Sequence, residues 1–152
     1  MPVKYRKMST CKLFRAAFAM FSVVAPVSIL KASDLTLVVD GVGPRRGEIQ
    51  AALCTREEYR ELKCRYSERA PARAQSVTLR FQNVENGTYS VAVFHDLHGD
   101  GRLRRSFLGI PEEGVGFSRD PLLLGRPAFS QTAFALHANA VIIVKLRFEP
   151  SE

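Results

Sequence analysis

The amino-acid sequence predicts an all-β domain, an antiparallel β-sandwich with one short helix. Three observations predict it: short segments in which apolar and polar residues alternate, turn signals between those segments, and the lack of any long helical pattern. In residues 76–81, for example, Val77, Leu79 and Phe81 share one face of the strand and polar side chains occupy the other. Strands of this length and spacing are typical of antiparallel sandwiches. A chain of 152 residues is long enough for one such domain.

Six segments carry the strand pattern. In chain order they are residues 35–39, 47–53, 76–81, 88–95, 133–136 and 141–148. The dipeptide Asn86-Gly87 is a strong tight-turn signal between the third and fourth segments. Tyr89 follows that turn, and we expect it either to bond its hydroxyl to nearby backbone as a corner residue or to be a half-buried strand aromatic. Residues 65–75 are polar, contain Pro71 and are not assigned to a strand.

The first 32 residues have the layout of a secretory signal peptide. Residues 4–15 are positively charged, and residues 16–30 form an apolar run that is shorter than the roughly 20 residues of a membrane span. We expect cleavage after Ala32, with Ala25 as the alternative site, and an uncleaved membrane anchor as the alternative interpretation. The mature protein, residues 33–152, is then a single domain without a transmembrane span, located in the periplasm or secreted.

The charge of the chain is distributed unevenly between this segment and the rest. Six of the 22 lysines and arginines lie in the first 31 residues, whereas all 15 aspartates and glutamates follow. The predicted mature domain carries 16 basic and 15 acidic residues, so its charge is nearly balanced. A balanced domain without a basic face does not favour nucleic-acid binding. The expected partners therefore include no nucleic acid, and the sequence identifies no particular ligand.

Cys54 and Cys64 are the two cysteines of the predicted mature domain. An even pair in an exported domain is typical of a disulfide. The segment between them has a helical composition, but a continuous helix over ten residues would hold its ends about 15 Å apart. Bridged Cα atoms lie within about 7 Å of each other, so the bridge requires the chain to turn back before Cys64. Two free thiols are the alternative, and a metal pair is disfavoured because no histidine lies nearby.

A connection of more than 30 residues, 97–129, separates the fourth segment from the fifth. It is rich in glycine and proline, and connections of this length in compact domains are either functional or disordered. It also contains apolar residues, among them Phe107, Leu108, Ile110 and Leu122. Their presence favours an ordered loop packed on the sandwich.

Several motifs around this long connection occur in a fixed order. They are Gly87 and Tyr89, Phe94-His95-Asp96, Gly99 and Gly101, Leu108-Gly109, Pro111, Glu113-Gly114 and Gly116-Phe117-Ser118. With these motifs the chain resembles the bacterial domain-of-unknown-function family 2141 over nearly the whole predicted mature domain. The resemblance implies an exported β-sandwich of the immunoglobulin-like or prealbumin-like type, and it implies no particular activity. The chain departs from the family pattern at His98, Arg102, Arg104, Arg105 and Ser106.

The loop that begins at Asp96 has a pattern related to calcium sites. Asp96, His98, Asp100 and Gly101 give the order D-x-H-x-D-G, whereas calcium loops place oxygen ligands at all three positions before the glycine. Imidazole is a poor calcium ligand, and three arginines follow in the same loop. We therefore expect no cofactor and expect the aspartates to bond to loop amides and arginines. Calcium or a transition metal at Asp96, His98 and Asp100 is the alternative.

His95, Asp96 and Glu113 are the candidate ligand-binding residues. By strand alternation His95 shares a face with apolar residues, so its ring is expected to point toward the core. A buried histidine bonded to backbone or to Glu113 is the structural interpretation, and a histidine–carboxylate pair for acid–base chemistry is the functional one. A serine hydrolase would also need a nucleophile, for which Ser106 and Ser118 are the nearby serines.

These observations favour a non-enzymatic module over an enzyme. No complete catalytic set is evident, whereas a β scaffold that carries one long ordered loop is suited to binding. We expect an exported binding or envelope-associated structural protein whose loop 97–129 presents the interaction surface to the envelope or to a protein partner. A cation-stabilised module and a hydrolase-like enzyme that uses His95, Asp96 and Glu113 are the alternatives.

Overall fold

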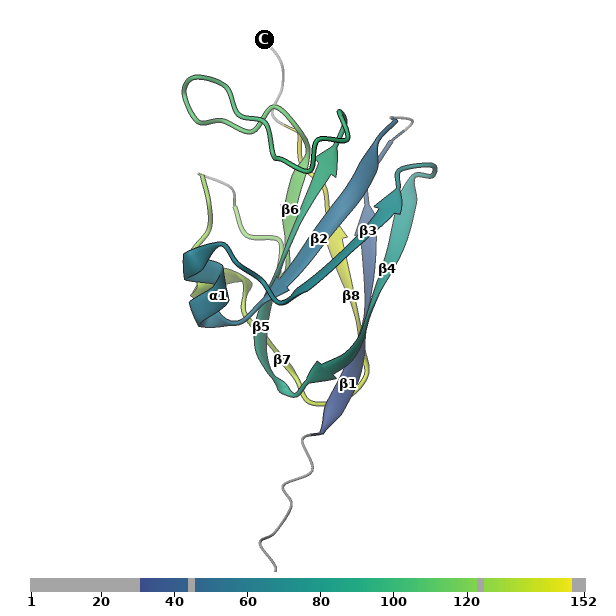
Figure 1. Cartoon of the computed structure of the whole chain (residues 1–152), viewed down its shortest axis with the longest axis vertical. Coiled ribbons are helices and arrows are strands. Elements are labelled where there is room, and N and C mark those ends of the chain that lie inside the picture. The colour runs from purple at the N-terminus through teal and green to yellow at the C-terminus, as the bar shows by residue number, and fades with distance from the viewer. Residues whose placement is uncertain (1–30, 44–45, 123–124, 149–152) are drawn as a thin grey trace, which may run out of the picture.

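The computed structural model describes residues 31–43, 46–122 and 125–148. These residues form eight strands and two short helices, and the strands are arranged in two sheets (Figure 1). The prediction of a mostly β domain is confirmed. Except for Lys31 and Ala32, the predicted signal peptide lies outside the described residues. Within the described part of the chain, no helix is both long and apolar enough to cross a membrane.

The first sheet has three strands in the order β4-β1-β8. β1 spans Ala32–Asp40, β4 spans Ser76–Glu85 and β8 spans Ala140–Lys145. β1 and β4 are antiparallel, but β1 and β8 run in the same direction, with Leu35 opposite Ala140. The expectation of a purely antiparallel sandwich is therefore wrong at this pair. Residue periodicity predicts which segments become strands, but it contains no information about which strands become neighbours.

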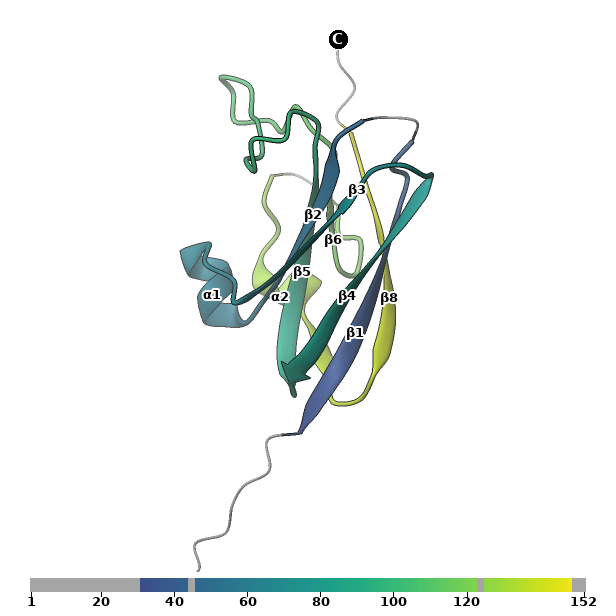
Figure 2. The same cartoon turned by 45° about the vertical axis from the view of Figure 1, so that its right-hand side comes forward.

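The second sheet has the order β3-β2-β5-β6, and β7 pairs with the start of β5. The bounds are Glu48–Cys54 for β2, Tyr66–Pro71 for β3, Gly87–Asp96 for β5, Val115–Phe117 for β6 and Phe134–Leu136 for β7. All pairings in this sheet are antiparallel. In Figure 2, β1 and β8 of the first sheet lie to the right of β2 and β5 of the second.

The strands β3 and β6 are absent from the sequence prediction. β3 is an edge strand with mostly exposed side chains, so it lacks apolar alternation, and Pro71 is tolerated at its last position. β6 has three residues around Gly116, where a Cβ would lie 2.6 Å from the carbonyl oxygen of Lys145. A glycine is needed there for close packing, although in sequence it resembles part of a loop. The connection 97–129 therefore contains a strand, and its last residue begins the helix α2, Phe129–Thr132.

The core lies between the two sheets and is formed by side chains at alternate strand positions. It includes Leu35, Leu37, Val39, Ile49, Leu53, Leu79, Phe81, Val91 and Val144, all of them buried. Burying one such side chain contributes about 1.5–3 kcal/mol, so this layer is the main source of hydrophobic stabilisation. The alternation predicted for residues 76–81 is confirmed, because Val77, Leu79 and Phe81 all belong to this core.

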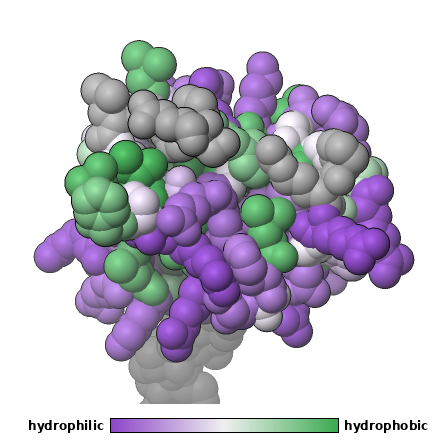
Figure 3. All heavy atoms as spheres, turned by 90° about the horizontal axis from the view of Figure 1, so that it is seen from above, coloured by the Kyte–Doolittle hydropathy of each residue, from purple (hydrophilic) through white to green (hydrophobic). Residues whose placement is uncertain are grey.

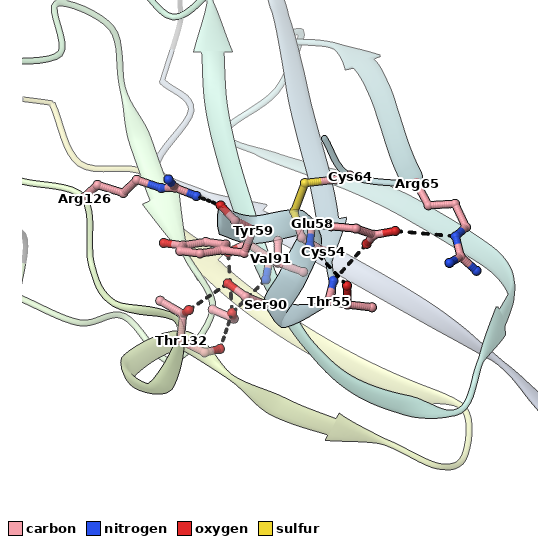
Figure 4. Close-up of a disulfide and its surroundings, with 11 residues drawn as sticks. Cys54, Thr55, Glu58, Tyr59, Cys64, Arg65, Ser90, Val91, Arg126 and Thr132 are labelled. Atoms are coloured by element: carbon pink, nitrogen blue, oxygen red, sulfur yellow. Dashed lines mark hydrogen bonds and ion pairs between the residues drawn. A yellow bond between two sulfur atoms is a disulfide. The ribbon is translucent and has the colours of Figure 1, made fainter. Parts of the chain in front are cut away.

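The short helix predicted between the two cysteines is confirmed as α1, Arg56–Glu61. Thr55 begins it with a capping box, in which its hydroxyl and its backbone N–H both bond to the third helical residue. The helix ends at Leu62, whose left-handed backbone (φ 59°) turns the chain back. The Cα atoms of Cys54 and Cys64 are thereby brought to 4.8 Å, and the predicted disulfide is present (Figure 4).

Removing this disulfide is expected to destabilise the domain. A bridge between residues 10 positions apart stabilises by about 2–3 kcal/mol in the chain-entropy model. The double variant C54S/C64S should lose that much of its free energy of unfolding in urea denaturation. As a control, dithiothreitol should lower the wild-type midpoint to that of the variant and leave the variant unchanged. A variant as stable as the oxidised wild type would contradict this role of the bridge.

Tyr89 is a corner residue, the first of the two expectations drawn from the sequence. Its side chain is buried, and its hydroxyl donates to the carbonyl oxygen of Glu85 at 2.8 Å. Its ring packs edge-to-face on Tyr66, with 6.2 Å between the centroids. The hydroxyl bond spans the Asn86-Gly87 turn, so Tyr89 fixes the geometry with which β4 leads into β5.

Candidate functional site

Three predicted site residues, His95, Asp96 and Glu113, lie buried where the long connection (residues 97–129) leaves the second sheet. His95 and Asp96 are the last two residues of β5, and Glu113 comes shortly before β6, the neighbour of β5. The amide of His95 donates to the carbonyl oxygen of Gly114 at 2.9 Å. The pairing of β5 with β6 thus brings the three residues to one end of the sheet.

The carboxylate of Asp96 accepts four hydrogen bonds. Its Oδ1 accepts from the backbone amides of His98 at 3.2 Å and Gly99 at 2.7 Å. Its Oδ2 accepts from the amide of Gly101 and from the side-chain amide of Gln50, both at 2.8 Å. The two glycines have φ values of 72° and 71°, a backbone that favours glycine and lets the loop amides converge. A carboxylate offers about four acceptor positions, so Asp96 is fully used, with three bonds to the loop and one to Gln50 on β2.

The pKa of the Asp96 carboxyl lies below its ordinary value. Burial by itself would raise this pKa, but hydrogen bonds from the backbone amides of Gly101, Gly99 and His98 together favour the ionised form more strongly. Asp96 is therefore an anion at neutral pH, and its bonds to the loop are charge-assisted.

Glu113 holds a second part of the same loop. Its Oε1 accepts from the backbone amide of Leu97 at 3.0 Å, and its Oε2 accepts from the amide of Arg104 at 3.1 Å. The Nδ1 of His98, a half-exposed side chain, lies 3.2 Å from Oε1. Together with Asp96, this carboxylate ties the start of the long connection to the end of the sheet.

His95 points into the core, as strand alternation predicts. Its side chain is fully buried, and its Nε2 donates to the carbonyl oxygen of Arg46 at 3.0 Å. The ring also packs edge-to-face against Phe148, with 6.1 Å between the centroids. These contacts connect the end of β5 to the segment before β2 and to the C-terminal part of the described chain. They agree with the structural interpretation of a buried histidine bonded to backbone.

Asp100 and His98 were the other two members of the predicted cation site. Asp100 accepts from the amide of Arg102 at 3.0 Å and forms an exposed ion pair with Arg104 at 3.1 Å. In the part of the chain that the structure describes, no group of three or more His, Cys, Asp or Glu side chains is arranged to hold a metal ion. The contacts of Asp96 and Asp100 therefore favour the expectation that both aspartates serve loop amides and an arginine.

The two nearby serines also have structural partners. The Oγ of Ser106 accepts from the amide of Ile110 at 3.3 Å in the exposed part of the connection. Ser118 is buried, and its Oγ accepts from the amide of Val91 at 2.9 Å and donates to the carbonyl oxygen of Thr132 at 2.6 Å. The geometry therefore supplies no direct support for either serine as a nucleophile.

Residues 105–111 form a hairpin within the long connection, at the upper end of the molecule in Figure 1. Arg105 and Pro111 pair as an antiparallel bridge. The amide of Ser106 donates to the carbonyl oxygen of Ile110 at 2.8 Å, so backbone polar groups are bonded inside the hairpin.

The end of this hairpin carries Phe107 and Leu108, which we call the apolar tip. Phe107 is 96% exposed and Leu108 is 69% exposed. Figure 3, viewed from above, shows hydrophobic side chains among hydrophilic ones on this end of the molecule. The prediction that apolar residues of the long connection pack on the sandwich is wrong for the tip and for Leu122, which is also exposed. The tip therefore places two neighbouring apolar side chains in solvent on a hairpin that bonds its own backbone.

A groove of about 540 Å³ lies on the outer face of the second sheet. Its floor is a row of small side chains that the strand register places side by side, Ser67 on β3, Ala52 on β2 and Ala92 on β5. Larger side chains from α1, from β5 and β6 and from the long connection form its walls. They include Tyr59, Leu62, Phe94, Phe117, Leu103, Arg105 and Arg126.

Sequence reasoning misses this groove. Alanine is compatible with either face of a strand, and the alignment of Ala52 with Ala92 depends on a register that the pattern does not contain. The available signal is that both alanines stand at outward positions of neighbouring central strands, where β-branched or polar residues are the common choice.

A comparison with protein families matches most of the domain. The sequence model of a family described as uncharacterised proteins conserved in bacteria (DUF2141) matches residues 37–143. No curated protein and no solved structure matches the chain. The matched range begins in β1 and ends in β8, so it includes both sheets, the long connection and the groove.

Proposed function

The chain belongs to the bacterial family DUF2141, and from this premise we propose that it is an exported, non-enzymatic β-sandwich module that attaches to the lipid surface of the cell envelope. The observation that carries this proposal is the apolar tip. Phe107 and Leu108 stand exposed on a hairpin in the same loop that Asp96 and Glu113 tie to the sheet. The loop 97–129 thereby presents the interaction surface.

Lipid is the partner that the chemistry of the tip favours. Aromatic and aliphatic side chains enter the boundary between headgroups and acyl chains, and a preformed hairpin does so without further ordering. Arg102, Arg104 and Arg105 precede the tip in sequence. Arginines near an anionic lipid surface each contribute about 1 kcal/mol, although Arg104 shares its charge with Asp100.

The non-enzymatic part of the proposal is supported by the use of the buried polar residues. Asp96, Glu113 and His95 all bond to backbone groups, and these bonds hold the loop and the strand ends in place. A catalytic acid or base would instead direct a hydrogen-bonding atom toward a substrate.

Export and fold type are further parts of the proposal. Export to the periplasm or beyond is supported by the signal-like segment 1–32 and by the disulfide, a bond that persists in oxidising compartments.

Of the two sandwich types, we favour the prealbumin-like one. In an immunoglobulin constant-type domain the first strand pairs with the second, whereas β1 here pairs with β4 and β8, and β2 belongs to the other sheet.

Co-sedimentation with vesicles of phosphatidylglycerol and phosphatidylethanolamine tests the attachment. We expect the wild type to bind and the variant F107S/L108S to bind at least about tenfold more weakly, because two buried apolar side chains contribute more than 1.4 kcal/mol. The matched control is Leu122→Ser, which removes a similarly exposed leucine outside the tip. Failure of the wild type to bind, or equal binding by F107S/L108S, would contradict the proposal.

A further inference from the structure

The groove on the second sheet is separate from the apolar tip and has the dimensions of a ligand site. Its volume of about 540 Å³ falls within the roughly 300–1,000 Å³ of small-molecule sites. It extends along β2 from Gln50 to Cys54, which corresponds to about 13 Å at the rise of a β-strand. The groove is therefore suited to an elongated molecule.

The floor and walls of the groove are more apolar than an exposed sheet face requires. Ala52, Ala92 and Phe94 provide half-buried apolar surface on the central strands. On the first sheet, Val141 and Ile143 are exposed on β8, whereas Thr78 and Arg80 occupy the exposed positions on β4. A solvent-facing antiparallel sheet ordinarily carries such polar residues. The apolar surface on β2 and β5 differs from that on β8 because the walls of the groove enclose it.

The charged side chains around the groove are mainly positive. Arg69, Arg105 and Arg126 line it, and Glu68 is the acidic residue of the lining. Arg69 lies 3.9 Å from Glu48, so its charge is partly balanced. The remaining imbalance lies with Arg105 and Arg126, which both belong to the long connection.

Both of these arginines are held in position by contacts to the protein. Arg126 lies over the ring of Tyr59, 4.0 Å from its centroid, and donates to the carbonyl oxygen of Tyr59 (Figure 4). Arg105 donates to the carbonyl oxygen of Gly109 at 3.0 Å. A guanidinium has five N–H donors, so each arginine retains donors for an anionic group.

We infer that the groove binds an elongated apolar molecule with a single acidic group, of the class of medium-chain fatty carboxylates. The chain lies along the floor formed by Ala52 and Ala92, and the acidic group is bound by Arg105 or Arg126. Arginine is suited to this role because its planar donors match a carboxylate.

Three probes with the same twelve-carbon chain test the inference: dodecanoate and dodecyltrimethylammonium below their micelle concentrations, and dodecanol below its solubility limit. Isothermal titration calorimetry on the purified protein should show the highest affinity for dodecanoate, a lower affinity for dodecanol and the lowest for the cation. The affinity for dodecanoate should exceed that for dodecanol at least tenfold. Ala92→Leu fills the floor and should weaken all binding at least tenfold. Thr78→Leu, which adds the same side chain to the outer face of the first sheet, is the matched control and should bind as the wild type does.

The double variant R105Q/R126Q removes the two positive charges and leaves the apolar floor of the groove unchanged. It should bind dodecanol as the wild type does and lose the preference for dodecanoate. No binding of dodecanoate at millimolar concentration, equal affinity for the three probes, a retained preference in R105Q/R126Q, or unchanged binding by a folded A92L variant would each overturn the inference. A92L should retain vesicle binding and F107S/L108S should retain dodecanoate binding, so failure of this inference is distinguishable from failure of the envelope attachment.

Discussion

Replacing Gly47 with alanine is expected to destabilise the domain by at least about 4 kcal/mol. Gly47 precedes β2 with φ of 112°, a conformation that disfavours any residue with a Cβ. A Cβ at this position would overlap the carbonyl oxygen of Asp96 and lie 3.0 Å from the Cα of Leu97. Both are backbone atoms at the end of β5, so relief of the clash requires the pairing of β2 with β5 to open there. Chemical denaturation of G47A measures the loss.

Gly99→Ala is the control for the clash at Gly47. Gly99 also has a positive φ, 72°, but a Cβ there would meet no atom within 4 Å. This variant isolates the backbone strain, which costs about 1–2 kcal/mol. If both variants lost the same stability, strain alone would explain the effect, and the close approach to Asp96 would not be the cause.

Replacing Asp96 with alanine is expected to cost about 3–5 kcal/mol. The change removes the acceptor of four hydrogen bonds from a buried position, and the side-chain amide of Gln50 loses its partner there. Hydrogen exchange should become faster at the amides of Gly99 and Gly101, which donate to this carboxylate. The control in the same loop is Asp100→Ala, an exposed ion pair whose loss should cost less than about 1 kcal/mol. Equal losses from the two variants would contradict the anchoring role of Asp96.

The lowered pKa of Asp96 also makes the free energy of unfolding depend on pH, with a stabilising contribution that is lost in acid. Because the folded pKa of Asp96 is lowered, its contribution is complete above the ordinary aspartate pKa of about 3.9. The contribution is lost as the pH falls through the lower, folded pKa. The stability difference between wild type and D96A should therefore be constant from pH 7 to about 5 and shrink below about 4. A difference that grew on acidification would contradict the lowered pKa.

The parts of the fold that depend on local pattern are predictable from the sequence. Alternation places Val77, Leu79 and Phe81 in the core, and the cysteine spacing with a helical segment leads to α1 and its bridge. The inward direction of His95 also follows from alternation. In each case the deciding interactions lie within a few residues along the chain.

The parts that depend on long-range neighbours are not predictable in this way. The parallel pairing of β1 with β8, the short strand around Gly116 and the alignment of Ala52 with Ala92 all depend on which strands meet. The exposure of Phe107 is a different case. Hydrophobicity predicts burial, and a hairpin that bonds its own polar groups can carry an apolar end into solvent.

The parallel pair formed by β1 and β8 has a consequence for the order of folding. Leu35 lies beside Ala140, 105 positions later in the chain. Contacts of such large sequence separation form slowly, because the intervening chain must be closed into a loop first. Until β8 arrives, one edge of β1 lacks its partner, and an open strand edge can pair with other chains. For a chain that emerges with its N-terminus first, arrival of β8 is therefore the step that closes this edge of β1.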